Sequence, residues 1–181
     1  MAFEIDLRND QTSLAVDDSV VRRAVAVALH AEQVKTAVIS ITIVDNATIH
    51  RLNREYLQHD YPTDVISFAL GFLADEDDED EDEDSDTDDV AVDRQSLTNL
   101  PSLSLPAAGA VIEGEIIASA EMACQMATEY AWEANSELLL YVVHGVLHLC
   151  GYDDLTPEDQ TVMRQREREI LGVLGLTGSG R

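Results

Sequence analysis

The sequence lacks any apolar segment long enough to cross a membrane. Its longest such stretch, Leu138–Cys150, is interrupted by two histidines, whereas a membrane-spanning helix needs about 20 consecutive apolar residues. The first residues, from Met1 to Asp6, also lack the basic region and apolar run that are typical of a signal peptide. We therefore expect a soluble, cytoplasmic protein with no membrane partner.

Cysteine is scarce too, since Cys124 and Cys150 are the only two in the chain. In a reducing cytosol both are expected to be thiols, so the fold cannot depend on a disulfide framework. Cys150 follows His148 by two residues and points to a different face of a helix, away from any ligand that His148 would share. We expect Cys150 to be a buried apolar side chain rather than a metal ligand.

Basic residues are few. The chain has 11 lysines and arginines against 36 aspartates and glutamates, which gives a formal charge of −25. Thirteen of the acids lie between Asp75 and Asp89 with no base among them, and removing these still leaves 23 acids against 11 bases, or −12. Because Lys and Arg at phosphates dominate affinity for nucleic acids, this composition argues against a strong, general RNA binder.

Only small groups of arginines are candidates for phosphate contacts. Arg51 and Arg54 are three residues apart, so they share a helix face and could hold one or two phosphates. Arg22 and Arg23 are interpreted as part of a solvated helix face. In residues 164–169 the arginines alternate with glutamates, and we interpret this stretch as solvated rather than as an RNA-binding surface.

With 181 residues the chain is long enough for one domain with a single core. We place this domain at residues 1–175, followed by a frayed tail at 176–181. Residues 74–108 differ in composition, because an acidic run gives way there to a Leu/Ser/Pro segment. Like charges repel one another and cannot form a core, so we predict a disordered surface insertion, most simply a solubilising one.

Alternating apolar residues and β-branched runs predict strands at Phe3–Leu7, Thr36–Val44, Val65–Ala69 and Glu113–Ala118. Between and after them, apolar residues at helical spacing predict helices. The predicted caps of four of them are Asp17 or Asp18, Asp45, Asn135 or Ser136, and Thr156. The helix capped by Asn135 or Ser136 covers Glu137–Leu149, and a further helix runs from Ser119 to Trp132. The pattern favours a single α+β domain with a small mixed sheet of about four strands packed with helices.

One segment near the C-terminal end has the residues of a metal site. His144 and His148 are four apart in a predicted helix, so their imidazoles leave the same face about 6 Å apart along the axis. Gly151 favours a left-handed turn that ends the helix and returns Asp153 or Asp154 toward the pair. Three such ligands with one open position are typical of catalytic zinc, although nickel, iron or copper would also accept them.

Two other interpretations of the histidine pair were weighed. Both histidines could be core residues bonded to neighbouring groups, but the following glycine and paired aspartates favour a metal. Zinc peptidases with the His-Glu-x-x-His pattern carry their general base directly after the first histidine. That position is Gly145 here, so a peptidase would lack its base.

Three blocks of the sequence resemble the YbeY family of bacterial endoribonucleases, which act in ribosomal RNA maturation. They are His144–Asp153, Leu52–Phe68 and Gly114–Ser119, and they occur in the family order. The resemblance implies a single-strand-specific, metal-dependent endoribonuclease in late ribosome quality control and in maturation of the 3′ end of small-subunit (16S) rRNA. It also implies single-stranded RNA or rRNA as substrate, small-subunit proteins as further partners, and contacts to substrate from Thr63, Asp64 and Ser67.

The sequence departs from the family pattern at two positions. Asp154 stands where the family usually has its third histidine ligand, and a carboxylate is also a zinc ligand. The resemblance therefore assigns one zinc ion to His144, His148 and Asp154. Leu57 stands where the family has an arginine implicated in cleavage, and Arg54, one helical turn earlier, is the candidate to replace it.

The departures leave two alternatives to a zinc-dependent endoribonuclease. The first is a ribosome-assembly factor whose metal is structural and whose nuclease activity has lapsed, which the leucine at position 57 favours. The second is a metal-dependent hydrolase that acts on another substrate.

Overall fold

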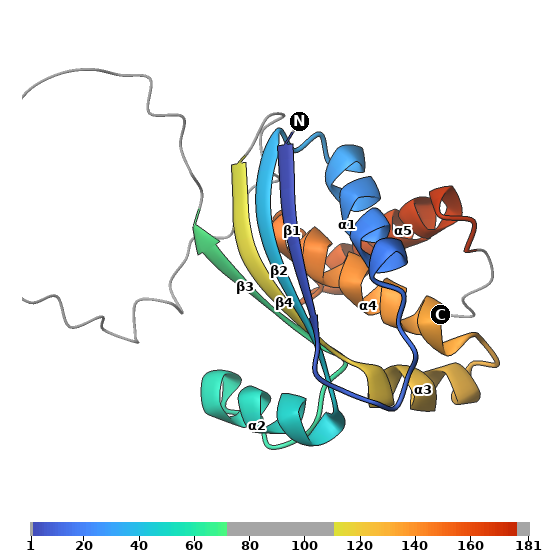
Figure 1. The fold of residues 1–181 in the computed structure, drawn as a ribbon. Coiled ribbons are helices and arrows are strands. Elements are labelled where there is room, and N and C mark those ends of the chain that lie inside the picture. Colours follow the sequence, from blue (N-terminus) through green and yellow to red (C-terminus); the bar gives the residue numbers. More distant parts are fainter. Residues whose placement is uncertain (1, 72–110, 177–181) are drawn as a thin grey trace, which may run out of the picture.

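The computed structural model describes residues 2–71 and 111–176. Within these ranges the chain forms four strands and five helices (Figure 1). In order they are β1 (Ala2–Asn9), α1 (Asp18–Ala31), β2 (Thr36–Val44), α2 (Asn46–Leu57), β3 (Val65–Gly71), β4 (Val111–Ser119), α3 (Ala120–Glu129), α4 (Ala134–Leu149) and α5 (Pro157–Val173). The insertion predicted at residues 74–108 lies outside the described residues, as does the predicted tail apart from Leu176.

The four strands make one mixed sheet in the order β1-β2-β4-β3. β1 and β4 pair parallel with β2, and β3 pairs antiparallel with β4. The α+β class, the single domain and the four-stranded mixed sheet are therefore confirmed. Because β4 lies in the middle of the sheet, both of its neighbours hold it in place under the helix that carries the histidines.

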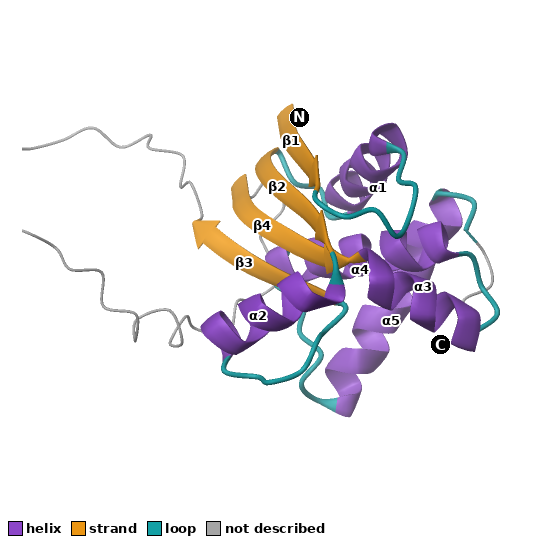
Figure 2. Cartoon of the chain, turned by 60° about the horizontal axis from the view of Figure 1, so that its bottom comes forward, coloured by secondary structure: helices purple, strands orange, loops and turns teal. Residues whose placement is uncertain are grey.

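The two faces of the sheet are covered unequally. Helices α1, α3, α4 and α5 lie on one face, whereas α2 lies on the other face near one end of the strands (Figures 1 and 2). Alternation along β2 explains this, because Ile39, Ile41 and Ile43 are buried in the main core while Val38 is 37% exposed. A smaller cluster joins α2 to the sheet and consists of Val44, Ile49, Ile66 and Ile117.

Side-chain caps fix the starts of four helices, and those at Asp17, Asp45 and Thr156 confirm the prediction from the sequence. The side chains of Asp17, Asp45, Ser119 and Thr156 each accept a hydrogen bond from a backbone N–H in the first turn of the following helix. Each bond satisfies a donor that a helix start leaves open. The predicted end of α3 at Trp132 is wrong, because the helix ends at Glu129 and Ala131 takes a positive φ of 52°.

Helix α4 begins differently from the prediction. It starts at Ala134, and its N-cap residue, Glu133, makes no side-chain cap hydrogen bond, so the predicted cap at Asn135 or Ser136 is wrong. Ser136 is itself buried inside the helix. Packing against the sheet and its neighbouring helices holds α4, with no need for a cap. No helix among the described residues combines the length and apolar character of a membrane span.

Two glycines allow α4 to lie close against β4. A Cβ on Gly114 would be 2.6 Å from Leu149 Cδ1 and 3.1 Å from the backbone oxygen of Phe68. A Cβ on Gly145 would be 3.0 Å from Ile116 Cγ2. A larger residue at Gly114 would therefore require atoms of the contact surface to move, and one at Gly145 would require a smaller shift of Ile116.

We expect Gly114→Ala to lower the free energy of unfolding by about 1–3 kcal/mol, the usual cost of overpacking a core, in urea denaturation. Gly172→Ala is the matched control, because a Cβ at this position on α5 meets nothing within 4 Å. The control should leave stability unchanged or raise it by up to about 1 kcal/mol, since alanine favours helices over glycine. Equal stabilities of the two variants would contradict the close contact.

Candidate metal centre

His144 and His148 are the two partly exposed residues of an otherwise buried segment of α4. From Ser136 to Cys150 every residue is buried except His144 and His148, which are partly exposed. Their ring centroids are 4.5 Å apart, and their Nε2 atoms are 2.9 Å apart. The predicted arrangement of two imidazoles on one helix face is therefore present, and the Nε2 atoms of both rings point toward each other.

A sharp turn after α4 brings a carboxylate to the pair. Gly151 has φ 91°, the left-handed conformation predicted for it, and the chain turns back there. Asp154 then lies with Oδ2 3.8 Å from Nε2 of His144 and Oδ1 4.0 Å from Nε2 of His148. Asp153 instead accepts a hydrogen bond from the N–H of Asp154, at 2.8 Å, and so shapes the loop. Of the two aspartates, Asp154 is the one at the site.

The other ring nitrogens are already engaged. Nδ1 of His148 lies 3.0 Å from the backbone oxygen of Tyr152, and Nδ1 of His144 lies 2.6 Å from Oε1 of Glu167. A carbonyl and a carboxylate oxygen can only accept, so both Nδ1 atoms must donate. In the neutral rings the Nε2 lone pairs therefore face each other, an arrangement that requires a proton or a cation between them.

The surroundings shift the pKa values of the two rings in opposite directions. Burial, the largest influence, lowers both. The hydrogen bond and charge of Glu167, together with the charges of Asp64 and Asp154, outweigh burial at His144 and raise its pKa above the usual value. His148 has a carbonyl rather than a carboxylate at Nδ1, and the nearby His144 lowers its pKa further. A proton between the rings therefore belongs to His144, and a metal cation would displace it.

The donor set fits a zinc ion. Ligand atoms of His144, His148 and Asp154 all lie within 4.8 Å of one another. Two imidazole nitrogens and one carboxylate oxygen make three protein ligands, which is the number in catalytic zinc sites, whereas structural sites use four. The hydrogen bonds at Nδ1 fix both rings with Nε2 toward the common point, as outer partners of metal-binding histidines do.

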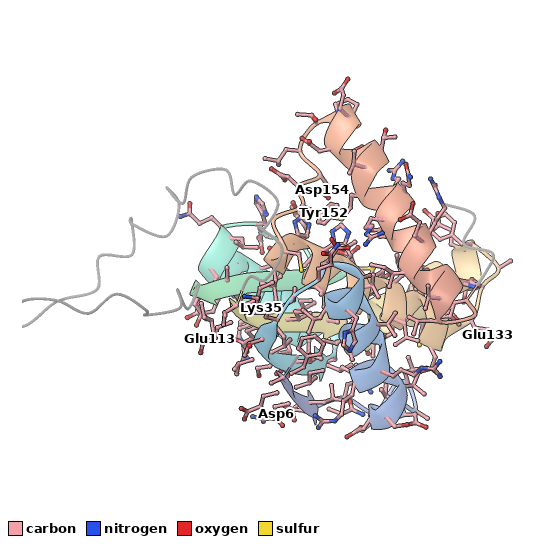
Figure 3. All side chains as sticks on the ribbon, turned by 90° about the horizontal axis from the view of Figure 1, so that it is seen from above. Asp6, Lys35, Glu113, Glu133, Tyr152 and Asp154 are labelled. Atoms are coloured by element: carbon pink, nitrogen blue, oxygen red, sulfur yellow. The ribbon has the colours of Figure 1, made fainter. Side chains whose placement is uncertain are left out.

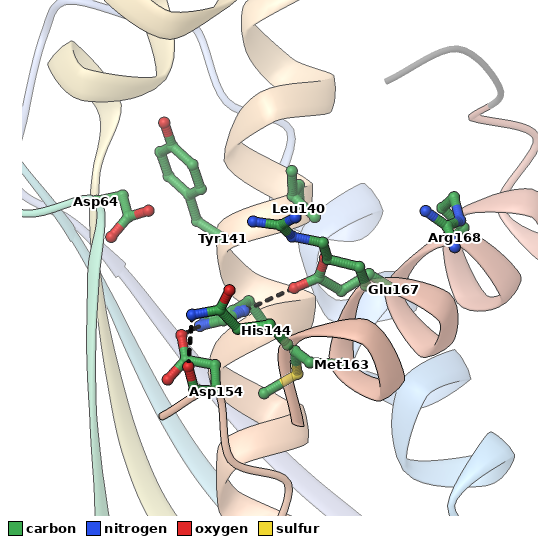
Figure 4. Close-up of a pocket in the computed structure, with 10 residues that line it drawn as sticks. Asp64, Leu140, Tyr141, His144, Asp154, Met163, Glu167 and Arg168 are labelled. Atoms are coloured by element: carbon green, nitrogen blue, oxygen red, sulfur yellow. Dashed lines mark hydrogen bonds and ion pairs between the residues drawn. The ribbon is translucent and has the colours of Figure 1, made fainter. Parts of the chain in front are cut away.

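A pocket of about 250 Å³ opens beside this cluster. It is lined by His144 and Tyr141 from α4, by Asp154, and by Asp64 from the start of β3 (Figure 4). The opposite wall comes from α5 and includes Arg164, Glu167 and Arg168. Two of the three candidate ligands, His144 and Asp154, therefore border a space large enough for part of a substrate, and His148 lies beside them.

A second set of contacts holds the loop that carries Asp154. The hydroxyl of Tyr152 donates to Oε2 of Glu32 at 3.0 Å, and Nε of Arg166 donates to Oε1 of the same carboxylate. Burial, and then the hydrogen bond to Glu32, raise the pKa of Tyr152 to about 12, so the phenol keeps its proton at neutral pH. Figure 3 shows Tyr152 and Asp154 together at this end of α4.

Two residues named by the sequence are excluded from the chemistry by their surroundings. Cys150 is fully buried, and burial raises the pKa of its thiol to about 12, so the prediction of an apolar packing residue is confirmed. Gly145 faces Ile116 on β4. A glutamate in its place would point into the core rather than into the pocket. The position could therefore not supply the general base of a peptidase even if it carried a carboxylate.

Other candidate residues lie apart from the pocket. Arg54, whose side chain is 63% exposed, is 3.9 Å from Asp60, and it is not among the residues that line the pocket. Leu57, at the end of α2, is 44% exposed. Of the three residues expected to contact substrate, Asp64 lines the pocket, whereas Thr63 and Ser67 do not. The sequence alone did not show which of these three residues lines the pocket.

Glu167 is the site residue that sequence reasoning missed. It lies in the stretch that we interpreted as solvated, but its side chain is only 12% exposed and is bonded to His144. Nothing in the spacing links the two residues, because they are 23 positions apart on different helices. A glutamate between two arginines does not by itself indicate that its side chain faces the candidate metal centre.

Together the fold and the site define a class: a single-domain α+β protein that presents two histidines and a carboxylate to an open pocket, as metal-dependent hydrolases do. The family model described as Endoribonuclease YbeY matches residues 4–175. The chain therefore belongs to the YbeY family, which confirms the resemblance seen in its sequence.

Curated relatives support the assignment. Proteins named Endoribonuclease YbeY from Roseiflexus castenholzii and Carboxydothermus hydrogenoformans are 39% and 33% identical over 172 and 174 residues. These alignments cover 94% of this chain in both cases, and 91% and 97% of the relatives. A relative of the same name from Rhodopirellula baltica is 37% identical over 140 residues, and the chain spans only 54% of its length.

One solved structure has the same fold. The solution structure of TM1509 from Thermotoga maritima superposes with a TM-score of 0.53 and 18% sequence identity. The match covers 98% of this chain and 95% of that chain. At this identity the likeness concerns the fold alone.

We expect Asp154→Asn to weaken zinc binding roughly 100-fold or more, because changes to outer partners alone cost about 10–100-fold. Competition with a chelator of known affinity measures this. Asp153→Asn is the matched control, since its remaining carbonyl oxygen still accepts from the N–H of residue 154. Equal losses in both variants would show that Asp154 acts on the loop rather than on the metal.

Glu167→Gln should weaken zinc binding at pH 8 by about 10–100-fold and lower the pKa of His144, because burial is then opposed only by the charges of Asp64 and Asp154. Competition with a chelator measures the zinc affinity, and NMR titration of the His144 ring in metal-free protein gives its pKa. Glu169→Gln, an exposed position on the same helix, is the control and should change neither value. An unchanged pKa of His144 in Glu167→Gln would contradict the contact.

Proposed function

We propose that this protein is a zinc-dependent endoribonuclease that cleaves single-stranded RNA. Its place would be the cytoplasm, in maturation of the 3′ end of small-subunit (16S) rRNA and in ribosome quality control, with small-subunit proteins as partners. The observation that carries the proposal is the pair of facing Nε2 atoms beside Asp154 and an open pocket. Membership of the YbeY family supports RNA as the substrate, because relatives carry the name endoribonuclease.

In this scheme His144, His148 and Asp154 hold the zinc ion. When bound, zinc would polarise a phosphate oxygen or a water molecule as a Lewis acid. Glu167 and the carbonyl of Tyr152 keep the two rings in the orientation that binding requires. The burial of α4 around the histidines lowers the local dielectric constant and strengthens each of these interactions.

Asp64 is the candidate to accept the proton of the attacking group. Its Oδ1 accepts from the N–H of Val65 at 2.9 Å and from the hydroxyl of Thr63 at 3.0 Å, so the carboxylate has a fixed direction. It faces the pocket across from His144 (Figure 4). We assign to Asp64 the acceptance of a proton from the hydroxyl or water that attacks the phosphate.

Arg54 keeps the role that the sequence suggested for it, stabilisation of charge that develops on the phosphate. Arg54 does not line the pocket, so it would reach the reacting phosphate only if the bound RNA brought that phosphate toward α2; otherwise its role is limited to holding RNA that extends from the pocket. Leu57 favours the second candidate function, a ribosome-assembly factor with a structural metal and no cleavage activity. Its exposed apolar side chain has no means of contacting a phosphate.

The test compares cleavage of a single-stranded RNA by zinc-loaded wild type and by His148→Ala, with metal content measured in the same preparations. We expect the wild type to cleave, and the variant to lose both the metal and the cleavage. His50→Ala is the control, because His50 pairs with Asp60 at 2.8 Å and does not line the pocket.

Two outcomes would reject the proposal. Cleavage by His148→Ala free of metal would show that the histidine pair does no chemistry. A wild type that holds zinc but cleaves no RNA, even after Leu57→Arg restores the family residue, would favour the assembly factor.

A further inference from the structure

The charged residues of α5 point in different directions, although they alternate along the sequence. Glu167 turns toward His144, and Arg166 is bonded to Glu32 and Glu169. The glutamates of this stretch therefore have partners of their own. Among the residues that the structure describes, no ion pair includes Arg164 or Arg168. The interpretation of residues 164–169 as a solvated stretch holds for the four exposed residues but is wrong for Arg166 and Glu167, which are partly buried.

Arg164 and Arg168 are four residues apart, so they stand one above the other on one helix face, about 6 Å apart along the axis. Both line the pocket that contains His144 and Asp154. Figure 4 shows Arg168 farther along α5, away from the His144–Asp154 cluster. The two guanidinium groups thus follow a line that leads out from the candidate metal centre.

The charge of the pocket is nearly balanced. Its carboxylates are those of Asp64, Asp154 and Glu167, and they face the guanidinium groups of Arg164 and Arg168. With His144 neutral the local sum is −1, and a bound divalent cation changes it to +1. In a chain with a formal charge of −25, this would make the metal-loaded pocket a local site of attraction for a polyanion.

Guanidinium groups suit phosphate because their planar N–H donors can bond two oxygens at once. We propose that Arg164 and Arg168 form a subsite for the phosphodiester backbone of a single-stranded nucleic acid, next to the metal centre. The subsite rests on the proposed function, because it places the strand for cleavage at the metal. It sets the path of the strand along α5 and contacts no bases, so it confers no sequence preference.

The experiment measures binding of a fluorescent single-stranded 2′-O-methyl oligonucleotide to zinc-loaded protein at several salt concentrations. Arg164→Gln/Arg168→Gln should weaken binding roughly tenfold and lower the salt dependence, by a slope of about 0.7 per lost phosphate contact on a single strand. Zinc content, measured in each preparation, should equal that of the wild type.

Two further variants separate a local contact from a general effect of charge. Arg22→Gln/Arg23→Gln removes the same charge from α1, away from the pocket, and should leave the slope unchanged. Arg164→Lys/Arg168→Lys keeps the charge and should recover most of the slope. Equal weakening by both glutamine pairs would overturn the subsite, as would a wild type that does not bind the oligonucleotide.

Cleavage of an RNA of the same sequence is measured separately and tests the proposed function. A wild type that binds through Arg164 and Arg168 but cleaves nothing would reject the nuclease and leave the subsite standing. A wild type that cleaves, with binding unaffected by Arg164→Gln/Arg168→Gln, would reject the subsite and leave the nuclease standing.

Discussion

The candidate metal centre depends on two imidazole rings that face each other on a buried helix. His144 and His148 direct their Nε2 atoms at each other across 2.9 Å, while Glu167 and the carbonyl of Tyr152 occupy the Nδ1 atoms. Neither ring can turn away without leaving a partly buried polar group unpaired, which costs about 1–3 kcal/mol. A cation at the shared point would satisfy both lone pairs, and the two Nδ1 contacts hold the rings in the orientation that this requires.

The rest of the domain maintains this geometry. Gly114 and Gly145 let α4 lie close on β4, so the helix has little freedom to shift. Gly151 then turns the chain at φ 91°, and the loop carries Asp154 back to the rings. Glu32, at the end of α1, holds the same loop through Tyr152. Contacts from the sheet, α1 and α5 thus all reach one cluster, although its three proposed ligands lie within eleven residues of one another in the sequence.

The parts of this arrangement that are local in the sequence could be predicted, and those that depend on tertiary packing could not. The spacing of His144 and His148, the turn at Gly151 and the four strands follow from periodicity and backbone preference. The start of α4 could not be predicted in this way, because burial of the helix rather than a capping side chain determines where it begins. Glu167 could not be assigned, since a charged residue on a helix shows no sign of which direction it faces until the neighbouring helix is placed.

X-ray absorption at the zinc edge of the zinc-loaded protein would show which atoms surround the metal. We expect a first shell of nitrogen and oxygen at about 2.0–2.2 Å, with the outer-shell scattering of two imidazoles. Sulfur at about 2.3 Å, or a spectrum without two imidazoles, would contradict it, because the metal would then lie somewhere other than between His144, His148 and Asp154.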